Sequence, residues 1–293
     1  MERTVRVDEH YELWVEETGS PEGSLVLLVM GANASGATWP DQLVARLGVR
    51  HRVVRYDHRD TGRSTRAFAE HPYAIRDLAQ DAVTVLDALG AGRAHVLGMS
   101  MGGTLVQLLL LDHPDRLLSA TVLATAALGS GPADPSGAGA PDLPGPDPRL
   151  LELWQHLADP RGPEEEIAWR VEHWRVLHGD VLPFDADEFR RLEERVVAHS
   201  GTAENPAAHA LADQSGLDRA RELAGVTVPV LVVEAPEDPV NPPPHAQHLA
   251  SVLGGARLVT IPGLGHALPA RVLEPLADAV LEHTSAVDVG HSG

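Results

Sequence analysis

Apolar residues recur along the chain in two alternating patterns, short continuous runs and longer stretches at helical spacing. The run from Leu25 to Met30 is continuously apolar and ends at Gly31, which is typical of a strand buried on both faces. Between about Ile75 and Leu89 the apolar residues are spaced three or four apart, which predicts a helix ended by Gly90. The same patterns predict further strands at Arg52–Tyr56, Ala94–Gly98, Ala120–Ala124, Pro229–Val233 and Arg257–Ile261, and further helices at Gly102–Leu111, His245–Leu253 and about Ala267–His283. Strands that alternate with helices predict a mostly parallel sheet with helices on both faces.

This alternation stops between Gly129 and Gly216. The stretch from Gly129 to Pro148 is crowded with Gly, Pro and Asp, which predicts a linker. After it the pattern is helical to about Gly216, and five of the eleven aromatic residues of the chain lie there. We therefore predict a core domain of residues 1–130 and 217–284, and a helical lid of residues 131–216 that begins with the Pro- and Gly-rich linker. Residues 285–293 are expected to form a disordered tail.

Composition and charge narrow the possible partners. The 293 residues include 42 acidic and 23 basic ones, and the formal charge of −19 disfavours binding to nucleic acid or to anionic membrane surfaces. The absence of cysteine excludes disulfides, thiolate metal sites and a cysteine nucleophile. The N-terminal residues lack the apolar segment of a secretory signal, and no apolar run could span a bilayer, so a cytoplasmic protein is expected. Most of the 16 histidines are expected at the surface.

The segment Gly98-Met99-Ser100-Met101-Gly102 matches the pattern G-x-S-x-G. A strand is predicted directly before Ser100 and a helix directly after it. In that context the serine lies on a sharp, strained turn that projects its oxygen above the sheet. The two flanking glycines lack a Cβ, which lets the strand and the helix approach closely. The motif therefore predicts Ser100 as a nucleophile.

A nucleophilic serine needs a base, and the base needs a carboxylate that orients it. Asp238 and His266 each follow a predicted strand in the last third of the chain. Because the carboxyl ends of parallel strands lie at one edge of a sheet, we expect both residues near Ser100. The order serine, acid, histidine is the one expected for an α/β hydrolase. Glu234 and Glu237 are alternatives for the acid that spacing leaves open.

The negative oxygen that forms during acyl transfer needs two backbone N–H donors. One is expected from Met101, the residue after the nucleophile, and the helix that begins near it also directs its positive end at this oxygen. The other is expected from the loop after the first apolar run, at Ala32, with Gly31 as the alternative.

Two other motifs carry competing interpretations. His245 and His248 have a metal-ligand spacing, but neighbouring carboxylate ligands are missing, so a helix face near the acid loop is the better interpretation. His58-Arg59-Asp60 imitates part of the kinase catalytic loop without the Gly-rich nucleotide loop that a kinase needs. We expect neither a metal nor an organic cofactor.

Together the motifs resemble the α/β-hydrolase-fold esterases. More narrowly, the chain resembles the aclacinomycin methylesterases, which remove the methyl from a carbomethoxy ester of anthracycline polyketides. RYDHRDTGRST and the lid stretches WRVLHG, PFD and EER carry the narrower resemblance. The other similar stretches, over roughly Tyr11 to Thr284, are LLVMGAN, WPDQ, HPY, HVLGMSMG, LDHPDRL, VTVPVLVVEAPEDP and IPGLGHALP.

The resemblance implies a role for each matching position. Ser100 would be the nucleophile, Asp238 the orienting acid and His266 the base, with the oxyanion bound at Ala32 and Met101. Two positions depart from the pattern: Ala32 stands where a second Gly is expected, and Gly103 stands where the methylesterases tend to have Ala. A methyl group at residue 32 leaves the backbone donor intact.

The implied reaction is hydrolysis of a carboxylic ester, most narrowly the methyl ester of a polyketide in antibiotic biosynthesis, with a small-molecule ester as the partner. Trp154, Trp169 and Trp174 of the lid would form an apolar wall for a flat polycyclic ligand, or pack in the core of the lid. The acidic charge would favour a cationic amino-sugar substrate. A lactonase, a general carboxylesterase, a cofactor-free haloperoxidase-like perhydrolase and a ligand-binding protein without activity are alternatives. The complete Ser, His and Asp set argues against the last. The oligomeric state is open.

Overall fold

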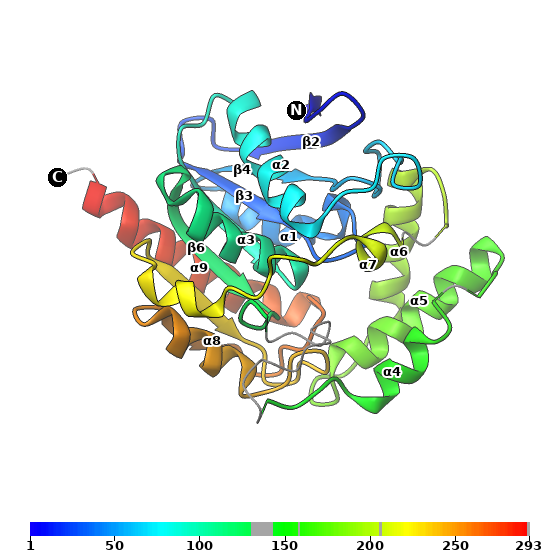
Figure 1. The fold of residues 1–293 in the computed structure, drawn as a ribbon. Helices are drawn as coiled ribbons and strands as arrows, with labels where there is room; N and C mark the ends of the chain where they lie inside the picture. Colours follow the sequence, from blue (N-terminus) through cyan, green and yellow to red (C-terminus); the bar gives the residue numbers. More distant parts are fainter. Residues whose placement is uncertain (130–142, 158, 205–206, 292–293) are drawn as a thin grey trace.

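An eight-stranded sheet is the central layer of the protein (Figure 1). The structure is a computed structural model that describes residues 1–129, 143–157, 159–204 and 207–291. The strands lie in the order β1-β2-β4-β3-β5-β6-β7-β8. They are β1 (Glu2–Arg6), β2 (Glu12–Gly19), β3 (Leu25–Val29), β4 (Arg52–Tyr56), β5 (Ala94–Met99), β6 (Leu117–Leu123), β7 (Val230–Glu234) and β8 (Arg257–Thr260). From β4 to β8 all neighbours are parallel, whereas β1 and β2 pair antiparallel, so the predicted α/β fold with a mostly parallel sheet is confirmed.

Helices cover both faces of this sheet. One face packs against α2 (Ile75–Ala88), α3 (Met101–Asp112) and α8 (His245–Leu253). The other face packs against α1 (Asp41–Gly48) and α9 (Ala270–His291). Short 3-10 turns are present at η1 (Gly36–Thr38), η2 (Pro114–Arg116) and η3 (Ala220–Gly225). Of the helices in the described ranges, none combines the length and the apolar character needed to cross a membrane.

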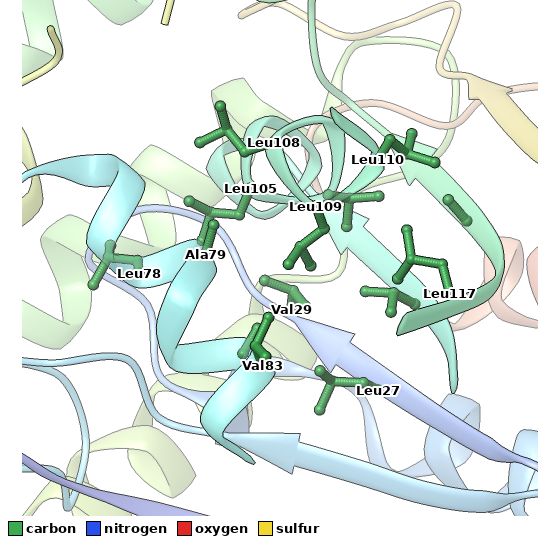
Figure 2. Packing of buried hydrophobic residues seen from close by; sticks show 14 of the residues in the cluster. Leu27, Val29, Leu78, Ala79, Val83, Leu105, Leu108, Leu109, Leu110 and Leu117 are labelled. Carbon is green, nitrogen blue, oxygen red and sulfur yellow. The ribbon is translucent and has the colours of Figure 1, made fainter. Parts of the chain in front are cut away.

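The central strands are apolar on both sides because each side meets a layer of helices. Successive side chains of a strand point to opposite faces, so Leu27 and Val29 of β3 pack toward α2 and α3 while Leu28 packs toward α1 and α9. Figure 2 shows Leu78 of α2 and Leu105 of α3 in the first of these layers. The continuous apolar run in the sequence is therefore a consequence of double-sided burial.

Four helices follow β6 and precede β7: α4 (Pro148–Trp154), α5 (Pro163–His178), α6 (Ala186–Ser200) and α7 (Ala208–Leu211). They lie together beside the sheet in Figure 1. Leu150, Leu177 and Phe189 from these helices form a cluster with Val240 and Ala267, which belong to the loops after β7 and β8. The helices occupy the segment predicted as a lid, and below we use the name lid for these four helices, while their closing over a site stays a prediction. Residues 130–142 of the predicted linker lie outside the described residues.

The structure corrects the prediction at both ends of the chain. The sequence patterns did not predict the edge strand β1 or its neighbour β2, because charged, partly exposed residues in both hide the alternation of apolar and polar positions. They also missed α1. The predicted disordered tail is wrong for residues 285–291, which continue α9 because Val287 is buried and Asp288 hydrogen-bonds His95 and Ser24. The last two residues of the predicted tail, 292–293, lie outside the described part.

Candidate active site

Ser100 lies on the turn between β5 and α3. Its backbone has φ 56° and ψ −122°, a left-handed conformation that L-residues adopt only under strain. Two backbone hydrogen bonds hold the turn: Ser100 N–H donates to Leu123 O at 3.0 Å, and Gly103 N–H donates to Ser100 O at 2.8 Å. The predicted sharp strand-to-helix turn is present.

The glycines on either side of Ser100 are required by close backbone contacts. A Cβ added at Gly98 would lie 2.3 Å from Gly102 O, and one added at Gly102 would lie 2.0 Å from Val29 O. Backbone atoms cannot move aside as a flexible side chain can, so both positions exclude any larger residue. This packing brings β3, β5 and α3 together at the serine.

Asp238 and His266 are joined directly. His266 Nδ1 donates to the Asp238 carboxylate, at 2.9 Å from Oδ1 and 3.0 Å from Oδ2. The N–H groups of Val240 and Asn241 donate to Oδ1 of the same carboxylate at 2.7 and 3.0 Å. Asp238 is only 3% exposed and His266 8%. The predicted base and the predicted orienting carboxylate are thus paired in a buried site, an arrangement that nucleophilic catalysis by serine requires.

Opposing influences act on the pKa of Asp238. Burial, the largest, raises it, but the charge and hydrogen bond of His266 and the two backbone N–H donors outweigh burial, so the pKa lies below its ordinary value. The aspartate is therefore ionised and can hold His266 with Nδ1 protonated, which leaves Nε2 to accept a proton.

The two alternative acids have other surroundings. Glu234 is buried and accepts hydrogen bonds from the side chains of Gln247 and Thr260, on α8 and β8. Glu237 lies against Gly179 at the end of α5. Of these three carboxylates, the one that contacts His266 is that of Asp238.

The structure places Ser100 at the same edge of the sheet as this pair, since β5, β7 and β8 are parallel and β6 alone separates β5 from β7. In the described part of the chain no hydrogen bond links Ser100 to His266 or Asp238. Such contacts often tighten only in the complex with substrate. Proton transfer between Ser100 and His266 stays a prediction.

The lid supports the His266 loop through its backbone. His266 N–H donates to Leu177 O, in the last turn of α5, at 2.7 Å. A Cβ added at Gly265 would lie 2.4 Å from His178 O, so the loop and the end of α5 are in close contact. The position of His266 therefore depends on the lid as well as on β8.

The predicted oxyanion donors also lie beside Ser100. Met101 begins α3, and the first N–H groups of a helix have no partner within it. Ala32 lies in the turn Gly31–Ala34, closed by a hydrogen bond from Ala34 N–H to Gly31 O at 3.4 Å. Asn33 has φ 57°, which suits the third position of a type II turn. A Cβ added at Gly31 would lie 3.2 Å from Ser100 Cβ, so this turn packs against the serine.

The three predicted substrate-binding tryptophans have different surroundings. Trp174 donates from Nε1 to Glu193 at 2.5 Å and stacks on Phe189, within the lid. Trp154 packs against the same lid cluster, and Trp169 is covered by the guanidinium of Arg161 at 4.4 Å. Packing within the lid accounts for Trp174, and a contact with substrate is a prediction for all three.

His173 of α5 is a candidate that the sequence patterns missed. Its Nε2 accepts the indole N–H of Trp154 at 3.2 Å, so the neutral ring carries its proton on Nδ1. Burial, and then the charge of nearby His266, lowers the pKa of His173 to about 4. The lid thus holds a neutral hydrogen-bond donor close to the candidate base. The only signal in the sequence is its position directly before WRVLHG.

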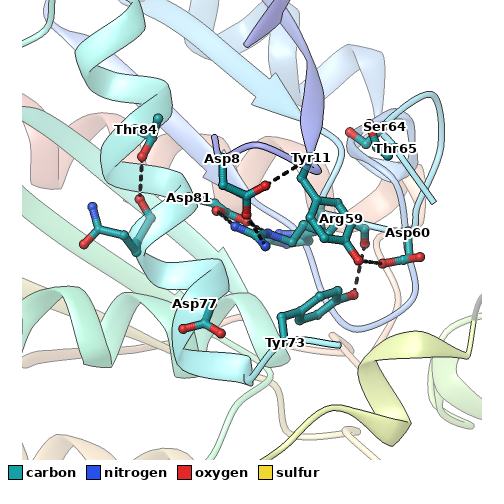
Figure 3. Close-up of polar contacts among 12 residues, drawn as sticks. Asp8, Tyr11, Arg59, Asp60, Ser64, Thr65, Tyr73, Asp77, Asp81 and Thr84 are labelled. Atoms are coloured by element: carbon teal, nitrogen blue, oxygen red, sulfur yellow. Dashed lines mark hydrogen bonds and ion pairs between the residues drawn. The ribbon is translucent and has the colours of Figure 1, made fainter. Parts of the chain in front are cut away.

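The motif RYDHRDTGRST contains the last two residues of β4 and the loop that follows, and its polar residues brace that loop. Asp57 is fully buried and accepts hydrogen bonds from Gly36 N, Arg63 N and His199 Nε2, all at 2.7 Å. Arg59 forms a two-pronged ion pair with Asp81, at 2.6 Å for both bonds (Figure 3). These contacts fix the path of the loop, and His199 ties it to α6 of the lid.

Side chains that could hold a metal ion converge at the opposite edge of the sheet. In the described ranges, His51, His95 and Asp288 form such a group, with possible ligand atoms within 4.8 Å of one another. Hydrogen bonds already use the ring nitrogens: those of His51 meet Ser24 and Thr284, and those of His95 meet Ser119 and Asp288. A buried hydrogen-bond network accounts for this group. The histidine pair His245 and His248, whose spacing suggested a metal site in the sequence, lies on α8, where the ring of His245 contacts Pro144 O.

Comparison with known proteins places the chain in a family. The model of the alpha/beta hydrolase fold matches residues 24–269, a range that contains all the predicted site residues. The chain belongs to the alpha/beta hydrolase family. This alpha/beta hydrolase is 47% identical over 289 residues to the rhodomycin D methylesterases DauP of Streptomyces sp. (strain C5) and DnrP of Streptomyces peucetius. Each alignment covers 94% of this chain and 96% of the relative.

A solved structure supports the same assignment. The alpha/beta hydrolase superposes on a hydrolase from Pseudomonas aeruginosa PA01 with a TM-score of 0.72 and 26% identity, over 96% of this chain and 97% of that one. The predicted resemblance to anthracycline methylesterases is confirmed by the two curated relatives.

Proposed function

We propose that this alpha/beta hydrolase is a serine esterase that removes the methyl from a carbomethoxy group on an anthracycline-type polyketide. The observation that carries the proposal is the 47% identity to two rhodomycin D methylesterases over 94% of the chain, a range that includes the lid as well as the core. The buried Asp238–His266 pair at the same sheet edge as Ser100 supports the reaction type.

In the proposed first step, His266 Nε2 takes the proton of Ser100 Oγ as that oxygen attacks the ester carbonyl carbon. The carbonyl oxygen becomes an oxyanion that accepts hydrogen bonds from the N–H groups of Ala32 and Met101. The bond to the methoxy oxygen then breaks, His266 returns its proton, and methanol leaves an acyl-serine behind. Asp238 keeps His266 in the required tautomer and stabilises its positive charge.

In the second step, His266 takes a proton from water as the water oxygen attacks the acyl-serine. The bond to Ser100 Oγ breaks, the proton returns to Oγ, and the carboxylic acid is released. Both half-reactions use the same base and the same oxyanion donors, which is why one buried histidine suffices.

The lid would supply the contacts to the polycyclic part of the substrate. We assign this role to Trp154 and Trp169, with His173 as a donor from Nδ1 to a ligand oxygen. His173 suits the role because Trp154 occupies its other nitrogen and burial keeps it neutral at physiological pH. An apolar wall with one fixed donor is the usual composition of a small-molecule site.

The direct test is mass spectrometry of rhodomycin D after incubation with the wild type, with Ser100→Ala and with Ser251→Ala as a matched control. Ser251 lies on α8 and is exposed, and among the described residues its hydroxyl donates to His248 O in its own helix turn. We expect the wild type and Ser251→Ala to convert the methyl ester to the acid, and Ser100→Ala to be slower by about 10⁴-fold or more. Cleavage of a simple activated ester but not of rhodomycin D would retain the serine mechanism and reject the substrate. Lactones, and esters supplied with peroxide, would then test the lactonase and perhydrolase alternatives.

A further inference from the structure

Two histidines outside the proposed triad are buried at the same edge of the sheet. His58 follows β4 and is 0% exposed, and His209 lies on α7 and is 2% exposed. Their rings meet edge to face, with centroids 5.6 Å apart. Burial lowers the pKa of His58 to about 3 and that of His209 to about 4, so both rings are neutral at physiological pH. Each neutral ring offers one hydrogen-bond donor, and the proposed reaction uses neither.

His209 is hydrogen-bonded to the turn that carries Ala32. Asn33 N–H donates to His209 Nδ1 at 2.8 Å, and His209 N–H donates back to Asn33 Oδ1 at 3.2 Å. The other ring nitrogen, Nε2, donates to Arg59 O at 3.0 Å. One imidazole therefore connects the lid segment before β7 with the loops after β3 and β4.

Arg59 is a rigid anchor for this connection. Its guanidinium pairs with Asp81 at 2.6 Å and with Asp8 at 2.8 Å, and it lies over the rings of Tyr11 and Tyr73 at 4.5 and 5.5 Å. Figure 3 shows Arg59 surrounded by these four side chains. The carbonyl that accepts from His209 consequently belongs to a residue with little freedom to move.

The two histidines fix the peptide groups on both sides of the proposed donor. His58 Nε2 donates to Met30 O at 3.0 Å, which orients the peptide between residues 30 and 31. His209 accepts from Asn33 N–H, which orients the peptide between residues 32 and 33. The peptide between them carries the N–H of Ala32. Its direction is set by its two fixed neighbours.

We propose that His209 is a positioning residue that aims the Ala32 N–H at the oxyanion, so that docking of α7 completes the oxyanion site. This inference rests on the proposed function, because it takes Ala32 as an oxyanion donor. It goes further in making a residue of the segment before β7 a determinant of the rate of acyl transfer.

Three substitutions separate this role from simple packing. In His209→Asn the side-chain oxygen stands near the place of Nδ1 and can accept from Asn33 N–H. In His209→Gln the amide nitrogen stands near the place of Nε2 and can donate to Arg59 O. His209→Ala removes both contacts. We expect kcat on p-nitrophenyl acetate to fall about tenfold or more in the Ala and Gln variants and less than about threefold in the Asn variant, with KM nearly constant.

Binding of phenylboronic acid gives a second readout, because its serine adduct places an oxygen in the oxyanion site. Its affinity should weaken in the same order as kcat across the three variants. His95→Gln is the matched control, since His95 is equally buried at the opposite end of β5 and should lose stability without a change in kcat. Equal loss of kcat in all three variants in proportion to stability, or no loss in any, overturns the proposal. Absence of ester hydrolysis by the wild type would overturn the proposed function instead.

Discussion

Each edge of the sheet holds a buried histidine paired with an aspartate, but the surrounding backbone differs. At the carboxyl edge, where the parallel strands end, His266 pairs with Asp238 at 2.9 Å. At the amino edge, where these strands begin, His95 pairs with Asp288 at 3.1 Å. The non-glycine residues of the described chain that have positive φ are Asn33, Asp60, Ser100 and Ala124. All four follow a strand at the carboxyl edge, after β3, β4, β5 and β6 in turn.

This difference in backbone geometry distinguishes the candidate active site from a histidine–aspartate pair that only stabilises the fold. At the amino edge, hydroxyl partners such as Ser24, Ser119 and Thr284 satisfy the buried imidazoles, and the described non-glycine residues there keep negative φ. At the carboxyl edge, strained turns aim N–H groups and side chains at a common point beyond the strands. Strain of this kind persists only where the rest of the fold enforces it. An aspartate–histidine pair alone is therefore no sign of catalysis.

The two aspartates provide the strongest test. Asp238→Asn should lower kcat about 10⁴-fold, because an amide at this position favours the wrong tautomer of His266. Asp288→Asn should leave kcat unchanged and lower the free energy of unfolding by about 1–3 kcal/mol. Ester hydrolysis and urea unfolding of both variants measure these effects. A comparable loss of kcat in Asp288→Asn would erase the distinction between the edges.

Two glycines near the ends of β5 test how tightly the backbone is packed at each edge. Gly98→Ala should destabilise the protein by about 3 kcal/mol or more, because its Cβ would lie 2.3 Å from a backbone oxygen. Gly92→Ala, before the amino end of β5, meets nothing within 4 Å and should change stability by less than about 1 kcal/mol. Chemical denaturation of both variants gives the comparison. Similar values for the two would show that the nucleophile turn can relax.

The buried histidines should make stability depend on pH. The pKa of His95 is lowered by burial to about 4, against 6.5 when free, so between these pH values the unfolded chain binds one more proton. The free energy of unfolding therefore falls as the pH falls through this window, by about 1.4 kcal/mol per pH unit for each such histidine. Urea unfolding at a series of pH values across the window gives the free energy of unfolding as a function of pH. The slope of that free energy against pH should be smaller by this amount in His95→Gln. An unchanged slope would mean that Asp288 keeps His95 protonated in the folded state.

The smallest predicted effect is the electrostatic attraction of substrate by the net charge of the whole protein, which involves neither edge of the sheet. With a formal charge of −19, the protein should attract a cationic amino-sugar ester more strongly at low salt. We expect kcat/KM for that substrate to fall about two- to threefold on raising the ionic strength to 0.15 M. A neutral ester should show no change. Equal salt dependence for the two esters would argue against steering by charge.

The core was predictable because its pattern is local. Six parallel strands and the helices between them produce apolar runs and helical spacings that stand out in sequence, and the predicted helix at His245–Leu253 has the observed bounds. The edge strand β1 and its neighbour β2 lack such a pattern because charged residues stand on both faces of each, Glu16 and Glu17 of β2 among them. Ser100, Asp238 and His266 could be proposed because each follows a strong strand signal.

The histidine partners were not predictable. We expected most histidines at the surface, and this is wrong for the eight that are buried: His51, His58, His95, His178, His209, His245, His266 and His283. The sequence identifies a histidine but does not show whether its ring is hydrogen-bonded to water or to a buried backbone carbonyl. His209 lies 176 positions from Asn33, and its partners on both loops are mostly backbone groups, which no residue spacing reveals.

The hydrogen bond from His266 N–H to Leu177 O has a consequence for recombining this protein with its relatives. A chimaera that exchanged the whole segment between β6 and β7 would also exchange the acceptor that holds the His266 loop. Crossover points are better placed so that Leu177, His178 and Gly179 stay with the parent that supplies residues 262–267. The proposed substrate contacts of Trp154 and Trp169, on α4 and α5, could then be transferred while the geometry around His266 is inherited intact.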